Sequence, residues 1–196
     1  MNMTKRYDEA LSFARTAHAG ALRKGTDIPY ITHPIETAHI AAEMTDDEDV
    51  IIAALLHDII EDTPYTADDI EERFGRRVSG LVLEESENKR RGESAASTWL
   101  VRKQETIDHL KNASIEVKLI ALADKLSNMR TSAERFRKIG ASMWQSFNMK
   151  DAALQGRYYR GIAECTKEFS DTPQWQEYVR LCDEVFGAES GLQATE

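Results

Sequence analysis

The sequence lacks the features of a membrane or secreted protein. No apolar run approaches the ~20 residues that a membrane-spanning helix needs, and no apolar signal region follows the N-terminal residues Met1 to Arg6. The only two cysteines, Cys165 and Cys182, lie in helical patterns without the spacing of a metal site, so we interpret them as reduced core residues. We therefore expect a cytoplasmic protein with no membrane partner.

The chain also lacks an excess of positive charge. Its 25 Lys and Arg residues face 34 Asp and Glu residues, which gives a formal net charge of −9. This balance argues against a general nucleic-acid-binding protein, because such proteins attract phosphate groups with basic surfaces. With 196 residues, 41% of them hydrophobic, the chain is long enough for one sizeable core. We expect a single domain over residues 1–196, with a core over about 5–187 and a mobile tail over 188–196.

No stretch of the sequence alternates apolar and polar residues as a half-buried strand does. Helical periodicity runs through most of the chain instead, and Asp47 and Ser114 follow helix breaks as candidate N-caps. The polar segment 87–94 is expected to form a loop over the active site. The predicted fold class is all-α. The predicted helices cover residues 5–19, 34–44, 47–61, 66–74, 75–86, 98–111, 114–137, 150–170 and 174–187.

The strongest chemical signal is the sequence His-Asp-Ile-Ile-Glu-Asp, which begins at residue 57 and follows the apolar run 51–56. His57 lies four residues before Glu61. Asp58 likewise lies four residues before Asp62, so each pair shares one face of the predicted helix. Burying these groups would be costly without a partner, and a divalent metal is the simplest one. The alternative is a helix end with solvent-facing acids and a satisfied core histidine.

Two further segments supply candidate ligands. His33 precedes Pro34, which suits the first position of a helix, and a histidine at such an N-cap can point into a cavity. Asp124 follows five apolar residues in a helical pattern, so we expect it to be buried and to need a partner. Asn128 and Thr131 lie about one and two turns further along the same face of that helix.

A mixed nitrogen and oxygen ligand set results from these segments: His33, His57, Asp58 and Asp124. Such a set suits Mn, Fe, Zn or Mg and leaves coordination positions open for water. It is typical of a catalytic metal site rather than a closed structural one.

The ligand set resembles the metal-binding signature of the HD phosphohydrolase superfamily. Within it, three blocks in this order resemble the (p)ppGpp hydrolase domain of the RelA/SpoT family and the stand-alone small alarmone hydrolases. The blocks are Arg23-Lys24-Gly25 leading to Pro29-Tyr30-Ile31-Thr32-His33-Pro34, then His57-Asp58-Ile59-Ile60-Glu61-Asp62-Thr63, then Leu122-Ala123-Asp124-Lys125-Leu126-Ser127-Asn128. The resemblance covers roughly residues 10–165 and implies a single HD-domain helical bundle of about eight to ten helices.

The resemblance also implies a reaction. One Mn(II) ion, or another divalent metal, would be held by the four ligands. Glu61 and Asp62 would position and deprotonate the attacking water, with their pKa values pushed apart by their closeness. Pyrophosphate would leave from the 3′ position of (p)ppGpp, so that GDP or GTP remains. The residues expected to bind this nucleotide substrate are Arg23, Lys24, Lys89, Asn128, Arg130 and Thr131.

Other interpretations stay open. Ala21 and Ser127 stand where this family often has a glutamine and a bulkier residue, and we expect them to border the base-binding side. The sequence therefore leaves open whether the base is guanine or adenine and whether the tetra- or the pentaphosphate is preferred. It also leaves open a role against a partner toxic synthetase. The oligomeric state is open as well, a homodimer included. The alternative functions are a nucleotide or NADPH phosphatase of the same superfamily and a non-catalytic nucleotide-binding module. The acid pair and the basic loop at Arg23 and Lys24 favour the alarmone hydrolase.

Overall fold

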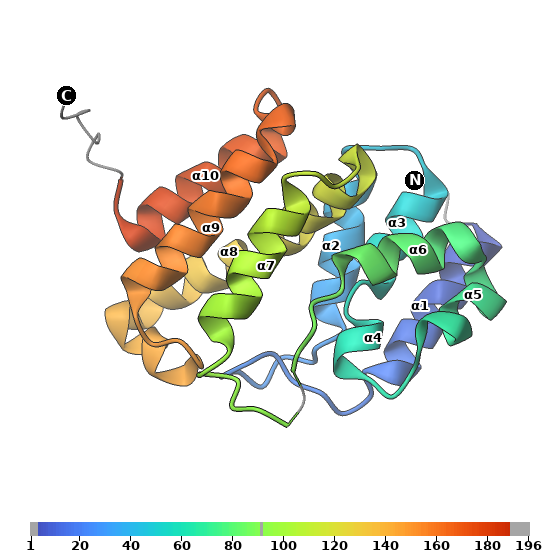
Figure 1. Cartoon of the computed structure of the whole chain (residues 1–196), viewed down its shortest axis with the longest axis horizontal. Helices are drawn as coiled ribbons and strands as arrows, with labels where there is room; N and C mark the ends of the chain where they lie inside the picture. The colour runs from blue at the N-terminus through green and yellow to red at the C-terminus, as the bar shows by residue number, and fades with distance from the viewer. Residues whose placement is uncertain (1–3, 91, 189–196) are drawn as a thin grey trace.

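A computed structural model describes residues 4–90 and 92–188. Within these ranges the chain forms ten α-helices and two short 3-10 helices and no β-strand, so the all-α prediction is confirmed (Figure 1). Most of the predicted mobile tail lies outside the described residues. The elements are α1 (Lys5–Ala17), α2 (Thr32–Ala42), α3 (Glu48–Leu56), α4 (Ile59–Asp62), α5 (Ala67–Phe74), α6 (Arg76–Glu85), α7 (Trp99–Leu110), α8 (Ile115–Ile139), η1 (Gly140–Ser146), α9 (Ala152–Cys165), η2 (Lys167–Phe169) and α10 (Pro173–Phe186).

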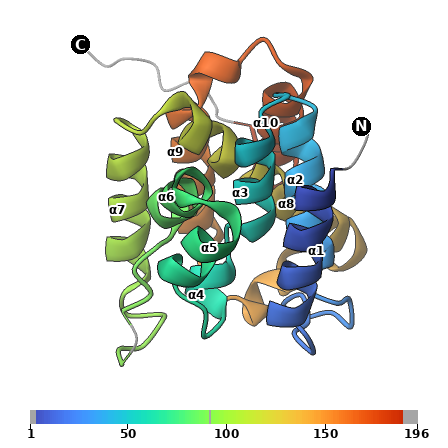
Figure 2. The ribbon, with the colours of Figure 1, turned by 90° about the vertical axis from the view of Figure 1, so that its right-hand side faces the viewer.

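The helices α3 and α8 form the centre of the fold. Every residue from Val50 to Leu56 in α3 is buried, and α3 contacts α1, α2, α6 and α8. Helix α8 contacts α2, α3, α6, α9 and α10 (Figure 2). The two central helices therefore carry, or lead directly into, three of the four candidate ligands, and the fourth, His33, lies on α2, which contacts both.

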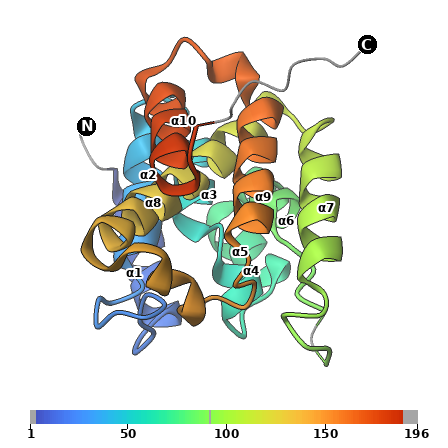
Figure 3. The same ribbon diagram turned by 90° about the vertical axis from the view of Figure 1, so that its left-hand side faces the viewer.

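The remaining helices enclose this centre from two sides. Helices α7, α9 and α10 cover one side, where α9 contacts both of the others (Figure 3). Helices α1, α5 and α6 lie on the other side (Figure 1). In all three views the loop between α1 and α2, the segment between α6 and α7, and η1 lie at one end of the molecule. The polar segments of the sequence are thus gathered at one end of the bundle.

Local sequence features behave as predicted at several points. The Asp47 side chain accepts a hydrogen bond from the backbone N–H of Asp49, and Ser114 accepts one from Val117, so both N-caps are confirmed. Cys165 and Cys182 are buried and free, as expected. Among the described residues, no helix has the length and apolar character required to cross a membrane.

Among the helix boundaries that differ from the prediction, two concern candidate ligand residues. The predicted continuous helix 47–61 is interrupted, because α3 ends at Leu56 and α4 begins at Ile59. Asp58, between them, has φ −88° and ψ −2°, which lies in the bridge region and turns the chain. Helix α2 begins at Thr32, so His33 lies in its first turn rather than at the N-cap. The break after α3 turns the Asp58 side chain out of the line of that helix, whereas His33 is presented by the first turn of α2.

Candidate active site

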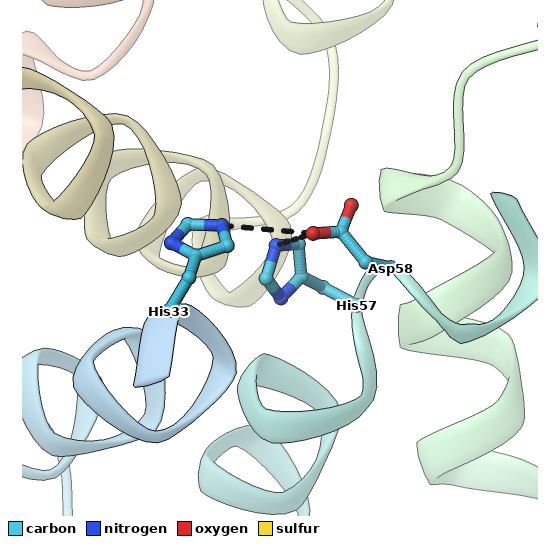
Figure 4. Close-up of side chains that lie close together, drawn as sticks. All are labelled: His33, His57 and Asp58. Carbon is cyan, nitrogen blue, oxygen red and sulfur yellow. Dashed lines mark ion pairs between the residues drawn. The ribbon is translucent and has the colours of Figure 1, made fainter. Parts of the chain in front are cut away.

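Three side chains from two segments distant in sequence meet at the centre of the fold. His33 comes from α2, and His57 and Asp58 come from the break between α3 and α4 (Figure 4). Each offers one ligand atom, and the three atoms lie within 4.8 Å of one another. His57 Nε2 is 2.9 Å from Asp58 Oδ2, and His33 Nε2 is 3.6 Å from the same oxygen. These three residues form a metal site.

The hydrogen bonds of His57 show that this site fits a cation. Its Nδ1 donates to the backbone carbonyl of Ala54 at 2.8 Å, which places the ring proton on Nδ1. Its Nε2 is buried and makes no hydrogen bond of good geometry within the described residues. Nε2 faces Asp58, and in the neutral form that carries its proton on Nδ1 this nitrogen offers its electron pair to a metal. Two imidazoles and a carboxylate are a suitable donor set for a divalent cation.

Asp124 lies beside this site on α8 and is 4% exposed, as buried as predicted. Its Oδ1 is 3.1 Å from His33 Nε2 and 3.7 Å from His57 Nε2. Lys125 forms an ion pair with its other oxygen, and Asn128 donates to Oδ1 at 2.5 Å. Burial opposes the charge on Asp124, but the neighbouring Lys125 ammonium holds its pKa well below the usual range. Asp124 therefore stays ionised and faces the two imidazoles.

Glu61 and Asp62 project from α4 next to the metal site. Lys89, from the segment between α6 and α7, lies 2.7 Å from Glu61 Oε2 and 3.4 Å from Asp62 Oδ1. The backbone N–H of Glu87 donates to the other oxygen of Glu61. Burial raises the pKa of Glu61, Lys89 opposes this rise and Asp58 adds to it. The leading cause is therefore burial, and not the repulsion between the two acids that the sequence analysis expected.

Tyr30 links the metal site to the acid pair. Its hydroxyl donates to Asp58 and lies 3.5 Å from Asp62 Oδ2. Its ring packs against the rings of His18 and His33, with centroid distances of 4.9 Å and 5.8 Å. Burial and the neighbouring carboxylates raise the pKa of Tyr30, so the hydroxyl stays a neutral donor. Tyr30 thus fixes the position of the ligand Asp58.

The metal site opens into a cavity of about 330 Å³. Beyond Asp124, the same face of α8 carries Asn128 and Thr131, as predicted. Arg23 reaches both from the loop between α1 and α2, donating to Asn128 Oδ1 at 3.2 Å and to Thr131 Oγ1 at 3.0 Å. This loop is thereby held against the helix that carries Asp124.

One end of the cavity is basic and consists of Arg23, Lys24 and Arg135. The Lys24 ammonium lies 5.6 Å from the centre of the Phe147 ring, and the Arg135 guanidinium lies 5.7 Å from it. Arg135 also donates to the backbone carbonyl of Lys24 at 3.2 Å. No acid of the described part of the chain forms an ion pair with any of the three. Arg135 is three helical turns beyond Asp124, roughly 16 Å along α8, whereas Arg23 reaches Asn128, one turn from Asp124.

The cavity is lined by five of the six residues that the sequence predicts for substrate binding: Arg23, Lys24, Lys89, Asn128 and Thr131. Arg130 does not line it. Its guanidinium donates to Glu177 on α10 at 2.9 Å and 2.6 Å and to Glu36 on α2 at 3.1 Å. At about 100° per residue, a side chain six positions after Asp124 points to a different face of the helix. Arg130 is therefore brought to the rear of α8 and not to the cavity.

The two departures from the family pattern also lie away from the cavity lining. Ala21 is exposed on the loop between α1 and α2. Ser127 is fully buried behind His33, where its hydroxyl lies 2.8 Å from His33 Nδ1. Neither residue lines the cavity, so the expectation that they border the base-binding side stays a prediction without support from the lining.

Several lining residues were missed by the sequence analysis. Arg135 continues the spacing of Asn128 and Thr131 along α8, so helical periodicity could have found it. Lys103, on α7, had no such signal, and it enters the site through an ion pair with Glu87 at 2.7 Å. Burial raises the pKa of Glu85 to about 8, so this cavity residue holds a proton over much of the neutral range.

Comparisons with known proteins identify a family and several proteins of similar sequence. A model of the HD domain family matches residues 10–147. The chain is 41% identical over 132 residues to the bifunctional (p)ppGpp synthase/hydrolase SpoT of Escherichia coli K12, covering 65% of this chain and 18% of SpoT. It is 37% identical over 128 residues to the guanosine-3′,5′-bis(diphosphate) 3′-pyrophosphohydrolase MESH1 of Drosophila melanogaster, covering 64% of this chain and 68% of MESH1. The chain thus spans less than a fifth of the bacterial relative.

The fold is similar to that of a solved structure described as a metazoan ortholog of SpoT that hydrolyzes ppGpp and plays a role in starvation responses. The TM-score is 0.77 at 24% sequence identity, over 96% of this chain and 99% of the other. This likeness concerns the arrangement of the helices.

Proposed function

The chain belongs to the HD domain family, and we propose that it is a metal-dependent hydrolase that removes pyrophosphate from the 3′ position of (p)ppGpp. The family confirms the resemblance inferred from the three sequence blocks. The observation that carries the proposal is a cavity with a metal site and an acid pair at one end and, at the other, basic side chains that form no ion pair with an acid of the described residues. An alarmone with phosphate groups at two positions of its ribose fits such a cavity.

We infer that Asp124 is the fourth ligand and that the ion is Mn(II). The support is the burial of Asp124 and its distances to both imidazoles, together with the family resemblance. A bound divalent cation supplies a Lewis acid that neutralises phosphate charge and lowers the pKa of water. Lys125 and Asn128 hold the Asp124 carboxylate ionised and oriented for this role.

Glu61 and Asp62 act together as the general base that positions and deprotonates the attacking water. Asp62 is 40% exposed and faces the cavity, so it can hydrogen-bond to a water molecule that approaches the phosphorus. Glu61 is more deeply buried and shares Lys89 with Asp62. Because burial raises the pKa of Glu61, this carboxylate can accept a proton at a pH closer to neutrality than an exposed glutamate can.

The basic end takes the second phosphate group of the substrate. Arg23, Lys24 and Arg135 are not neutralised by acids of the described chain, so an anion placed there gains charge-assisted hydrogen bonds. A nucleoside monophosphate has its single phosphate at the metal and leaves this end unused. This difference favours the alarmone over the mononucleotide, although NADPH also carries phosphate groups at two positions.

Product analysis separates these substrates. The purified protein with Mn(II) should convert ppGpp to GDP and pyrophosphate, and a Glu61→Ala, Asp62→Ala double variant should not. Parallel reactions with ppApp and NADPH test the base and the alternative phosphatase function. Phosphate release from NADPH without turnover of ppGpp would move the protein to the phosphatase class. Binding of ppGpp without turnover of any of these compounds would indicate a nucleotide-binding module.

A further inference from the structure

A chain of hydrogen bonds runs from the rear of the metal ligand His33 to the surface. His33 Nδ1 lies 2.8 Å from the Ser127 hydroxyl, and that hydroxyl donates to Glu36 Oε2 at 2.7 Å. Glu36 Oε1 accepts from Arg130 at 3.1 Å, and Arg130 donates twice to Glu177. His33 and Ser127 are buried, whereas the three charged residues are each about one-third exposed. The chain connects α2, α8 and α10.

The direction of these hydrogen bonds determines the tautomer of His33. A serine hydroxyl has one proton, and an ionised carboxylate can only accept a hydrogen bond. The Ser127 hydroxyl therefore donates its proton to Glu36. The hydroxyl must then accept from His33, which places the ring proton on Nδ1. The other ring nitrogen, Nε2, lies 3.6 Å from Asp58 Oδ2 (Figure 4) and 3.1 Å from Asp124 Oδ1. Its electron pair is therefore directed into the metal site.

The two metal-site histidines are fixed in different ways. The Nδ1 proton of His57 is held by the backbone carbonyl of Ala54, which can only accept a hydrogen bond. That of His33 is held by a hydroxyl, which can either donate or accept. Without a carboxylate beyond it, the hydroxyl could donate to Nδ1, and the proton of His33 would then sit on the metal-binding nitrogen. His33 thus depends on Glu36 in a way that His57 does not depend on any side chain.

We propose that Glu36 and Ser127 are positioning residues of the metal site, and that Arg130 holds Glu36 in place from its ion pair with α10. This inference rests on the metal site of the proposed function and not on the identity of the substrate. It gives Arg130, which does not line the cavity, a role behind the site. Replacement of such outer partners of a metal-bound histidine typically weakens metal binding about 10–100-fold.

Glu36→Gln is the sharpest test, because the glutamine amide can donate to Ser127 and reverse the direction of the hydrogen bonds. We expect this variant and Ser127→Ala each to bind Mn(II) about 10–100-fold more weakly than the parent. Free Mn(II) is measured directly by electron paramagnetic resonance during titration of the full chain. The matched control is Glu184→Gln, which breaks a two-fold Arg137–Glu184 ion pair between the same helices α8 and α10. It should leave Mn(II) affinity unchanged.

A second readout needs no metal. Nitrogen-15 spectra of the histidine side chains in the metal-free protein should show the same Nδ1-protonated fraction of His33 in the parent and in Glu184→Gln. Glu36→Gln should shift His33 toward the Nε2-protonated form and leave His57 unchanged. Equal Mn(II) affinities of the parent, Glu36→Gln and Ser127→Ala, or an unchanged His33 tautomer, would overturn the proposal. Equal weakening by Glu184→Gln would also overturn it, because a general loosening of the bundle would then explain the loss.

The two proposals can fail separately. If the parent does not bind Mn(II), the choice of metal is wrong, and the tautomer comparison still decides the role of Glu36. If the parent binds Mn(II) and hydrolyses ppGpp but Glu36→Gln is unaffected, only the positioning role is wrong.

Discussion

Removal of the metal should lower the stability of this protein by a predictable amount. The residues of the metal site come from α2 and from the break between α3 and α4, so the unfolded chain does not bring them together. Binding is therefore coupled to folding, and Mn(II) at 100 times its dissociation constant should stabilise the folded state by about 2.7 kcal/mol. For a chain of 196 residues, this corresponds to a rise in Tm of roughly 5–11 °C.

Thermal unfolding in EDTA and in Mn(II), at equal ionic strength, measures this difference. Asp58→Asn should lose most of the Mn(II)-dependent rise, because it removes the carboxylate of the metal site. Asp108→Asn is the matched control, since Asp108 is an exposed acid of α7 whose side chain pairs with Lys111. The same Tm for the parent in EDTA and Mn(II), or a full rise in Asp58→Asn, would refute the reasoning.

Three further predictions concern the acid pair and the helix that carries Asp124. Glu61→Gln should lower kcat by about 10²–10⁴-fold and keep the Mn(II)-dependent rise in Tm; loss of that rise would make Glu61 a ligand instead of a base. Burial raises the pKa of Glu61, and the Lys89 ammonium lowers it. Lys89→Met should therefore raise this pKa and move the acid limb of the pH–kcat profile to higher pH. An unmoved limb would show that Glu61 is not the group that loses its proton. Ser114→Ala removes the N-cap of α8 and should cost about 1 kcal/mol in urea unfolding, whereas altered Mn(II) affinity would contradict a purely local role.

The sequence predicted those parts of the site in which residue type and helical spacing determine position. The buried run 51–56 and the apolar residues before Asp124 defined the two central helices, and Asn128 and Thr131 were placed on the correct face. These predictions succeeded because a buried carboxylate in an apolar helix has few alternatives to an ion or a donor. The assignments of Asp124 as a ligand and of the acid pair as the base stay predictions, as do the cytoplasmic location, the single domain and the oligomeric state.

Features that depend on tertiary contacts were not predictable. The break at His57 and Asp58 has no Gly or Pro to announce it, and periodicity alone indicates a continuous helix. Arg130 was grouped with Asn128 because the two are close in sequence, although they point to different faces of α8. Its partners, Glu36 and Glu177, lie on helices that are distant in sequence, and only their packing against α8 reveals the ion pairs.

Hydrolysis of ppGpp in ¹⁸O-labelled water is the most direct test of the proposed reaction. With Mn(II), the protein should release pyrophosphate that contains one ¹⁸O atom and leave GDP that contains none, because water attacks phosphorus and the 3′ oxygen stays on the ribose. The reaction should stop in EDTA. Release of orthophosphate, label in the nucleotide, or equal turnover in EDTA would contradict a metal-dependent 3′-pyrophosphohydrolase.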